Sequence, residues 1–326
     1  MFSPSRRPKA IAMLVVANLT WGLSFPITKA VEDLQQRLVP ESGGTFITAC
    51  ALAPRFLLSL AMLAAISLIG KKGTPPINRR EIRQGLTMGL LIGTGLLFQV
   101  DGLRFTAAST SAFLTQFYAI MIPVWLAFRL RRNPGAVIWT CCGLVLVGVA
   151  ILSHFDPRTF RLGRGELETL LSSLFFMGPI FSLEDKANAS NRSGKVTLVM
   201  FGTQSAIFTA FMLASAPRAG ALLAPWASGS WVALTLVLAV FCTLGAFWVM
   251  NTWQRHITAT EAGLLYCLEP VFASILAAFL PAVLSEWAHV GYANEKITSS
   301  LVIGGSLVTL ANIIIQLRAT PEIEPK

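Results

Sequence analysis

Ten apolar runs, each close to the length that crosses a membrane, dominate this sequence. A transmembrane helix needs about 20 consecutive apolar residues to span the hydrocarbon core of a bilayer. Such runs lie at residues 10–31, 45–70, 85–103, 106–128, 135–153, 167–185, 195–215, 230–253, 259–281 and 298–317. Most linkers between them are short, so consecutive helices are expected to be antiparallel neighbours. We therefore predict an all-α integral membrane protein with ten transmembrane helices.

The low content of charged residues supports the same fold class. Only 13% of the 326 residues are charged, whereas soluble domains carry about 25%. The mean hydropathy is +0.64, so a lipid bilayer is the expected surrounding. The net charge of +10 comes from short basic clusters between the apolar runs. Because no basic stripe marks a soluble face, nucleic acid is not an expected partner.

The positions of lysine and arginine predict the topology. When the N-terminus is placed inside, most of the 26 basic residues fall in inner segments, as the positive-inside rule requires. Ten helices return the C-terminus to the same side. We therefore predict a multi-pass protein of the cell inner membrane with both termini cytoplasmic. The outer cluster Arg158, Arg161 and Arg164 runs against this rule.

The two halves of the chain show a faint internal repeat. The segment RFTAAS (104–109) precedes the fourth run, and RHITAT (255–260) precedes the ninth. Proline and glycine recur in paired runs: Pro26 with Pro179, Pro123 with Pro270, and Gly143 and Gly148 with Gly304 and Gly305. Because five helices is an odd number, the second half would enter the membrane from the opposite side. Many secondary transporters use such an inverted repeat for alternating access.

This organisation predicts five segments. They are a cytoplasmic N-terminus (1–9), a first repeat (10–153), a connecting loop (154–166), a second repeat (167–317) and a cytoplasmic tail (318–326). The glycines of the fifth and tenth runs are expected to pack the two helices against each other or against another subunit, so a homodimer is left open.

Several segments resemble the EamA-type proteins of the drug/metabolite transporter superfamily. They are NLTWGLSFPITK (18–29), GLRFTAASTSAFLT (102–115), GLVLVGV (143–149), LEPVF (268–272) and IGGSL (303–307). The resemblance extends over essentially the whole chain. It implies two inverted five-helix repeats around a central cavity, alternating access, and transport of amino acids, nucleotide sugars, other metabolites or drugs. Two departures are the basic Arg131-Arg132-Asn133 after the fourth run and a long segment at 281–297.

Arg55 and Glu269 are the charged residues deepest within the apolar runs. Ionisable groups at membrane depth are costly and usually face a cavity or a partner. Arg55 is a candidate for binding an anionic substrate group; pairing with a carboxylate or snorkelling to the outer interface are the alternatives. Glu269 directly precedes Pro270, which can break the helix. Its carboxylate is a candidate for binding a cationic group or a proton, and a structural, protonated carboxyl is the alternative.

Four further side chains are candidates for lining the cavity. They are Trp21, Gln116, Tyr118 and Tyr266, which are polar or amphipathic and lie in runs with repeat partners. If Arg104 and Arg255 are equivalent, Gln116, Tyr118 and Tyr266 lie at similar depths. For the tryptophan, an interfacial position is the alternative. Asp101 and Arg104 are expected to form a local ion pair.

No motif of an enzyme is present. The sequence contains neither a zinc-protease helix, nor a nucleophile elbow, nor a phosphate-binding loop. The five cysteines lie inside apolar runs without metal spacing. We therefore predict no catalytic residue, no metal site and no cofactor, and expect coupling to ion or substrate gradients.

The sequence thus favours a secondary transporter, an exporter by family resemblance, of small polar metabolites such as amino acids. Its partners would be a small-molecule substrate and the bilayer. Two alternatives stay open. One is a polytopic membrane enzyme or an accessory protein without transport activity. The other, within transport, is a carrier of nucleotide sugars or of drugs and other cations.

Overall fold

The computed structural model describes residues 6–69, 76–129, 135–152, 162–257 and 259–318, and all regular elements in these ranges are helices. The α-helices are α1 (Arg7–Leu38), α2 (Gly44–Ile69), α3 (Arg79–Leu103), α4 (Ala108–Thr115), α5 (Tyr118–Arg129), α6 (Ala136–Leu152), α7 (Arg164–Glu184), α8 (Ser193–Ser215), α9 (Gly229–Val237), α10 (Ala246–Trp253), α11 (Ala259–Tyr266), α12 (Glu269–Ala277), α13 (Leu280–Ala288) and α14 (Ser299–Arg318). The π-helix η4 (Leu238–Gly245) joins α9 to α10. Short 3-10 turns are η1 (Lys186–Asn188), η2 (Ala219–Leu222), η3 (Ala224–Ala227) and η5 (Gln254–His256).

Every predicted apolar run lies on a helix or on a group of consecutive helices. Within the described ranges, six helices are long and apolar enough to cross a membrane. The bent pair of α12 and α13, with 53° between its members, makes up to seven. The multi-pass, all-helical prediction is therefore confirmed, whereas the count of ten spans stays a prediction. Polar residues extend α1 to Leu38, beyond residue 31, and let α3 begin at Arg79, before residue 85.

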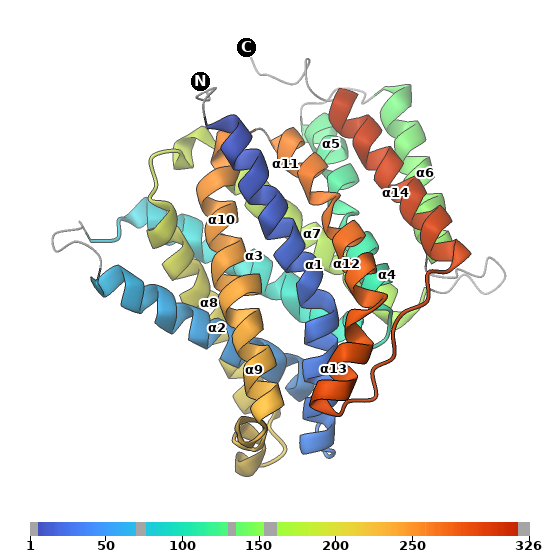
Figure 1. Ribbon diagram of the computed structural model, residues 1–326. Coiled ribbons are helices and arrows are strands. Elements are labelled where there is room, and N and C mark those ends of the chain that lie inside the picture. Colours follow the sequence, from blue (N-terminus) through green and yellow to red (C-terminus); the bar gives the residue numbers. More distant parts are fainter. Residues whose placement is uncertain (1–5, 70–75, 130–134, 153–161, 258, 319–326) are drawn as a thin grey trace.

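The first helix begins and the last helix ends at the same end of the molecule. α1 begins and α14 ends at the top of Figure 1, whereas α1 ends beside α13 at the bottom. We call the top the inner end, because the sequence predicts that it faces the cytoplasm, and the bottom the outer end. α7 begins at Arg164, inside the segment predicted as a connecting loop. The tail at 319–326 and Arg158 and Arg161 lie outside the described residues.

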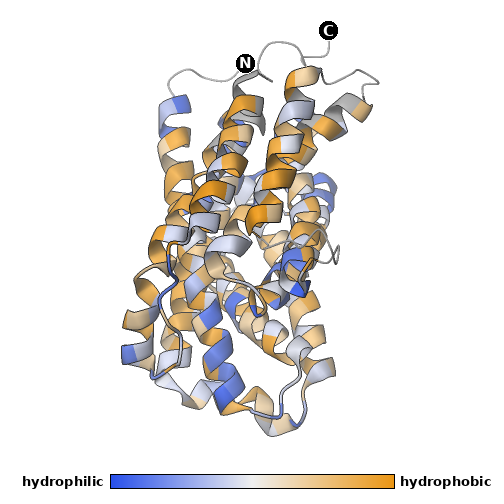
Figure 2. Ribbon diagram, turned by 90° about the vertical axis from the view of Figure 1, so that its right-hand side faces the viewer, coloured by the Kyte–Doolittle hydropathy of each residue, from blue (hydrophilic) through white to orange (hydrophobic). Residues whose placement is uncertain are grey.

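A broad apolar surface covers the helices. Figure 2 shows hydrophobic residues along most of their length, with hydrophilic residues gathered toward the helix ends. Large apolar side chains such as Leu68, Ile69 and Phe128 are exposed. Soluble proteins rarely expose such contiguous apolar area. Lipid is the solvent that this surface fits, so the chain is a multi-pass membrane protein.

Glycines let neighbouring helices approach closely. α6 packs along α14, where a Cβ on Gly148 would lie 2.8 Å from the carbonyl oxygen of Gly304. α3 packs along α7 and α8, and Gly102 faces Gly165 at the α3–α7 contact. Small residues at such contacts are typical of membrane helices. Gly148 and Gly304 therefore serve a contact between α6 and α14 within the chain, one of the two arrangements the sequence left open.

Two predicted helices are broken at corresponding positions. The run 106–128 forms α4 and α5, which are separated at 116–117; the run 259–281 forms α11 and α12, separated at 267–268. The residues that begin and end these helices are separated by the same number of positions along the chain: Ala108 from Ala259, Thr115 from Tyr266, and Tyr118 from Glu269. Proline lacks a backbone N–H and is favoured in the first turn of a helix. Pro270 accordingly stands at the start of α12.

The segment 281–297 holds a helix that the apolar pattern did not reveal. α13 occupies Leu280–Ala288 and ends at His289, whose φ of 54° is left-handed. The predicted ninth helix thus ends at Ala277, earlier than residue 281, and a new helix begins at a bend. The rest of the segment runs over the outer end toward α14 (Figure 1).

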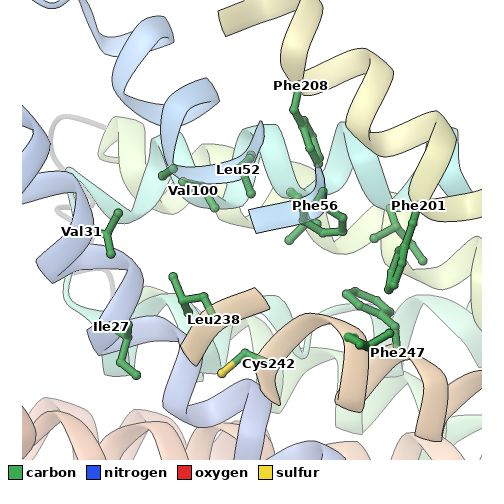
Figure 3. Close-up of a cluster of buried hydrophobic side chains, with 14 of the residues drawn as sticks. Ile27, Val31, Leu52, Phe56, Val100, Phe201, Phe208, Leu238, Cys242 and Phe247 are labelled. Carbon is green, nitrogen blue, oxygen red and sulfur yellow. The ribbon is translucent and has the colours of Figure 1, made fainter. Parts of the chain in front are cut away.

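An aromatic cluster forms the centre of the core. Phe56 of α2 lies 5.8 Å from Phe201 and 5.0 Å from Phe208 of α8, measured between ring centroids. Phe247 of α10 completes the cluster at 6.1 Å from Phe201. Figure 3 shows these rings beside Leu238 and Cys242 of η4. Edge-on and tilted aromatic contacts of this kind add to the stability that burial gives. The cluster fixes α2, α8 and η4–α10 as one wall of the molecule.

Candidate functional site

A cavity of about 100 Å³ lies among α1, α2, α3, α7, α10 and the two broken helices. One water molecule needs roughly 10–15 Å³ on this measure, so the space holds several waters or part of a small metabolite. Most of the lining is apolar or aromatic. The polar side chains that line it are Ser24, Thr28, Arg55, Gln99, Thr115, Tyr118, Tyr266 and Glu269. A mostly apolar cavity with a few convergent polar groups is typical of a ligand site.

The two helix breaks supply a matched set of these polar groups. Thr115 and Tyr118 flank the break between α4 and α5, and Tyr266 and Glu269 flank the break between α11 and α12. A break leaves helix ends with unsatisfied backbone groups and partial charge at membrane depth. Discontinuous helices of this kind form the substrate and ion sites of many transporters. The cavity therefore lies where the fold concentrates polarity.

Arg55 projects from α2 with only 3% of its surface exposed. Its Nε donates to the hydroxyl oxygen of Thr243, and its Nη2 donates to the carbonyl oxygen of Cys242 at 3.2 Å. Its guanidinium also lies 5.7 Å from the ring centroid of Phe56. Among the described residues, these neutral groups are its partners and no carboxylate pairs with it. The positive charge thus remains available to an anionic group in the cavity.

The π-helix η4 explains why Arg55 is held in this way. A π-helix widens the turn and is frequent at functional sites. η4 presents the Cys242 carbonyl and the Thr243 hydroxyl to the guanidinium. Ser59, one turn after Arg55, donates to the carbonyl oxygen of Ala239 at 2.9 Å, or to that of Arg55 at 2.8 Å. α2 is therefore fastened to η4 at two successive turns, and Arg55 is oriented by backbone and hydroxyl oxygens.

Glu269 is the first residue of α12 and is 8% exposed. A carboxylate is favoured at a helix N-terminus because the backbone N–H groups point toward it. The hydroxyls of Tyr118 and Tyr266 lie close enough to interact with it electrostatically. Gln116, in the other break, approaches it as well. Both polar atoms of the Gln116 amide are buried without a partner of normal hydrogen-bond geometry in the described part of the chain.

Trp21 and its neighbours form an aromatic wall of the cavity. The Trp21 ring meets Phe247 at 5.5 Å and Tyr266 at 5.7 Å between centroids, both edge-on. The Tyr266 hydroxyl donates to Oε1 of Gln254 at 2.5 Å, which fixes the ring from the inner side. Gly22 brings α1 against α12, where a Cβ would lie 2.8 Å from Cβ of Phe272. The close contact of these helices turns Trp21 toward the cavity.

The first half of the chain gives the decisive comparison. Residues 8–154, which include α2 to α6 and all but the first residue of α1, match the EamA-like transporter family. Over 311 residues the chain is also 27% identical to an uncharacterized transporter of Archaeoglobus fulgidus, covering 94% of this chain and 85% of that protein. Residues 8–154 are an EamA-like transporter domain. The resemblance that the sequence motifs indicated is thereby confirmed, and this EamA-type chain is a membrane transporter.

A solved structure shares the fold of this EamA-type chain. A crystal structure of a protein aligns with a TM-score of 0.58 and 15% identity, covering 97% of this chain and 99% of that chain. At this level of identity the likeness shows the fold alone. The shared fold includes both halves of the chain.

The structure brings five of the six predicted site residues to one cavity. Trp21, Arg55, Tyr118, Tyr266 and Glu269 line it. The sixth, Gln116, is 1% exposed and lies in the break behind it rather than in the lining. No group of three or more histidine, cysteine, aspartate or glutamate side chains able to hold a metal occurs within the described residues.

Sequence reasoning missed the uncharged polar residues of the cavity. Gln99 of α3 donates to the hydroxyl oxygen of Thr115 at 2.9 Å, and both line the space. Thr28 and Ser24 line it from α1. Gln99 stands alone within an apolar run, a pattern that indicates an interior-facing side chain in a membrane helix. The threonines and serines carry no such signal, because they occur on every face of membrane helices.

Proposed function

We propose that this EamA-type protein is a secondary transporter of small polar metabolites with an amino group, such as amino acids. The observation that carries the proposal is one cavity lined by a buried guanidinium, Arg55, and a buried carboxylate, Glu269. A zwitterion offers a carboxylate to the first group and an ammonium to the second. Buried, hydrogen-bonded charge pairs of this kind give specificity because a mismatched ligand leaves a charge unpaired.

The matched helix breaks support alternating access. Corresponding bounds of α4–α5 and α11–α12 favour two related halves of five helices each. In an inverted repeat, the halves rock about a site near the bilayer midplane and expose it to each side in turn. Ten spans, export, and an inner-membrane position with both termini cytoplasmic belong to the same proposal, the direction by family resemblance and the orientation by the positive-inside rule.

Cationic amines are the second candidate class. Trp21, Tyr118 and Tyr266 surround Glu269 with aromatic rings. Aromatic faces next to a carboxylate suit ammonium groups by cation–π attraction. Nucleotide sugars fit less well, because Arg55 is the one cation among the described residues that line the cavity, whose volume is about 100 Å³.

Counterflow in proteoliposomes tests the proposal. Vesicles loaded with unlabelled amino acids, amines or nucleotide sugars would be followed for entry of the labelled solute. We expect saturable exchange of amino acids, strongly reduced in Glu269→Gln and in Arg55→Met. Exchange of amines that needs Glu269 but not Arg55 would favour the second class.

The matched control is Glu41→Gln, which removes an exposed outer carboxylate whose partner is Arg218, at 2.5 Å from Nε to Oε1. This variant should exchange solute as the wild type does. Exchange that persists unchanged in both cavity variants would refute the assigned site. Folded wild-type protein that exchanges no solute of the three classes would refute the substrate assignment.

A further inference from the structure

A buried carboxyl group without a partner lies outside the polar lining of the cavity. Glu32 is on α1, one helical turn beyond Thr28, which lines the cavity, and toward the outer end. Only 4% of its surface is exposed. Neither carboxylate oxygen has a hydrogen-bond partner among the residues that the structure describes. Buried carboxylates in proteins are nearly always paired or hydrogen-bonded, so Glu32 needs an explanation.

The charged groups around Glu32 come from α1 and α3. Lys29 and Asp33 lie near it on its own helix, and Asp101 of α3 and Arg104, which follows α3, interact with it electrostatically. Lys29 is engaged elsewhere, because its Nζ donates to the carbonyl oxygen of Thr106 at 2.7 Å. Asp33 also interacts with Lys29 and Arg37, and Asp101 pairs with Arg104 and Arg164. These cations therefore already have partners, and none of them forms an ion pair with Glu32 in the described part of the chain.

Asp101 forms ion pairs with two cations near Glu32, Arg104 and Arg164. Its Oδ1 lies 3.3 Å from Nη1 of Arg104 and accepts from the Thr48 hydroxyl at 3.2 Å, and its Oδ2 accepts from Arg164. The expected Asp101–Arg104 pair is therefore present, within a larger network that includes Glu168, 2.8 Å from Nε of Arg164. The Arg104 contact is long for a charged hydrogen bond. Arg104 is thus the cation best placed to exchange partners.

An ionised carboxylate without hydrogen bonds is far more costly in a buried site than a neutral one. The smallest ligand that removes this cost is a proton. A metal cation is a poorer fit, because Na⁺ or a divalent ion needs several oxygen ligands. No group of three histidine, cysteine, aspartate or glutamate side chains able to hold a metal is found in the described ranges of the chain.

We propose that Glu32 is a proton-binding site at the outer end of the cavity, with Arg104 as the counterion that replaces the proton. In the arrangement seen here, the carboxyl of Glu32 carries the proton and Arg104 stays with Asp101. When the outer end opens, the O–H bond breaks and the proton passes to water on that side. The guanidinium of Arg104 then pairs with the carboxylate. Arg104 precedes α4, so this exchange is connected to one of the two broken helices.

Proton binding at Glu32 does not depend on any substrate, whereas its role in coupling rests on the transport proposed above. The direct test is infrared difference spectroscopy of the purified protein in lipid nanodiscs, recorded while the pH is changed. A protonated carboxyl has a C=O stretching band separate from that of a carboxylate. We expect one such band to disappear in Glu32→Gln and to remain in Asp33→Asn. Glu269→Gln assigns any band that comes from the buried carboxyl in the cavity.

Identical carboxyl bands in the wild type and in Glu32→Gln would overturn the proposal. Thermal unfolding gives a second readout, because glutamine has nearly the shape of the neutral acid and should fold. Above the ordinary range of a glutamate carboxyl, about pH 4–5, the wild type should lose stability as the pH rises, since the buried group keeps a proton that the unfolded chain releases. Glu32→Gln should lose less stability than the wild type, and Asp33→Asn should follow the wild type. Equal pH dependence in all three would contradict the assignment.

Transport experiments separate this proposal from the previous one. If solute exchange occurs, a pH-sensitive dye inside the vesicles should report proton movement with net solute flux. That movement should be lost in Glu32→Gln while solute exchange persists. If no solute is exchanged but the infrared band is lost in Glu32→Gln, the proposed substrate fails and the proton site stands. Proton movement that is unchanged in Glu32→Gln would refute the coupling role.

Discussion

Replacing Arg55 by methionine should separate stability from binding. Arg55 is buried, donates to two neutral oxygens, of Thr243 and Cys242, and lacks a carboxylate partner among the described residues. A buried charge loses several kcal/mol of hydration, which its hydrogen bonds only partly restore. Methionine keeps much of the volume and removes the charge. We therefore expect the free energy of unfolding of Arg55→Met to stay within about 1 kcal/mol of the wild type, or to rise.

The effect on a carboxylate-bearing ligand should be far larger. Removing one member of a buried charge pair costs about 2–5 kcal/mol of binding free energy. At 1.4 kcal/mol per tenfold, this is a loss of affinity of roughly 30-fold to several thousand-fold. Lysine at the same position retains the charge but not the fork of donors that reaches both oxygens. Arg55→Lys should therefore bind with intermediate affinity.

The assay is thermal unfolding of purified protein with increasing ligand. Ligand that binds only the folded state raises its stability by RT ln(1 + [L]/Kd), so the same scans give both quantities. Thr243→Val is the matched control, because it removes an acceptor of Arg55 and leaves the charge. It should lower stability by about 1–3 kcal/mol, the cost of an unpaired buried donor. A large stability loss in Arg55→Met together with undiminished ligand stabilisation would refute the reasoning.

Three further predictions concern packing and the outer end. Gly148→Val should cost about 1–3 kcal/mol of stability, because a Cβ meets the carbonyl oxygen of Gly304 at 2.8 Å; Gly143→Val, which meets nothing within 4 Å, should cost little, and equal losses in thermal unfolding would contradict this. Phe201→Ala should cost about 3–5 kcal/mol of stability, since the ring is fully buried. A loss below about 1 kcal/mol in denaturant titrations would show that neighbouring side chains fill the space left by the removed ring. Glu295→Gln should cost about 0.5–2 kcal/mol, because its carboxylate caps α4 by accepting from the backbone N–H of Ala108 at 2.6 Å; an unchanged unfolding temperature would argue against the cap.

The apolar runs predicted where the helices lie but not where they end. α3 begins at Arg79 rather than near residue 85 because Asn78 and Glu81 form a capping box, with Glu81 N–H donating to Asn78 Oδ1 at 2.8 Å. The sequence contains this signal in an Asn-x-x-Glu pattern. The widened turns of η4 have no comparable signal, since they depend on what α2 presents to them. Local pattern thus locates helices, and tertiary contacts shape them.

Charge made part of the candidate site predictable. Arg55 and Glu269 stood out because a charge at membrane depth is costly unless a cavity or partner receives it. Gln99 and Thr115 were missed because uncharged polar groups cost much less. Glu32 was missed for a different reason: the first apolar run was taken to end at residue 31, whereas α1 continues to Leu38. Its burial arises from helices that lie far away in the sequence.

The two broken helices begin their second parts with different residues. Tyr118 starts α5 and Glu269 starts α12, so corresponding positions hold a neutral phenol and an acid. The helix breaks are thus repeated, but only the break in the second half carries an acidic residue at this position. We expect a bound molecule to keep its cationic head toward α12 whichever side of the membrane the site faces. Its orientation relative to α12 would then be the same on entry and on release, so transport would not require the molecule to turn over within the site.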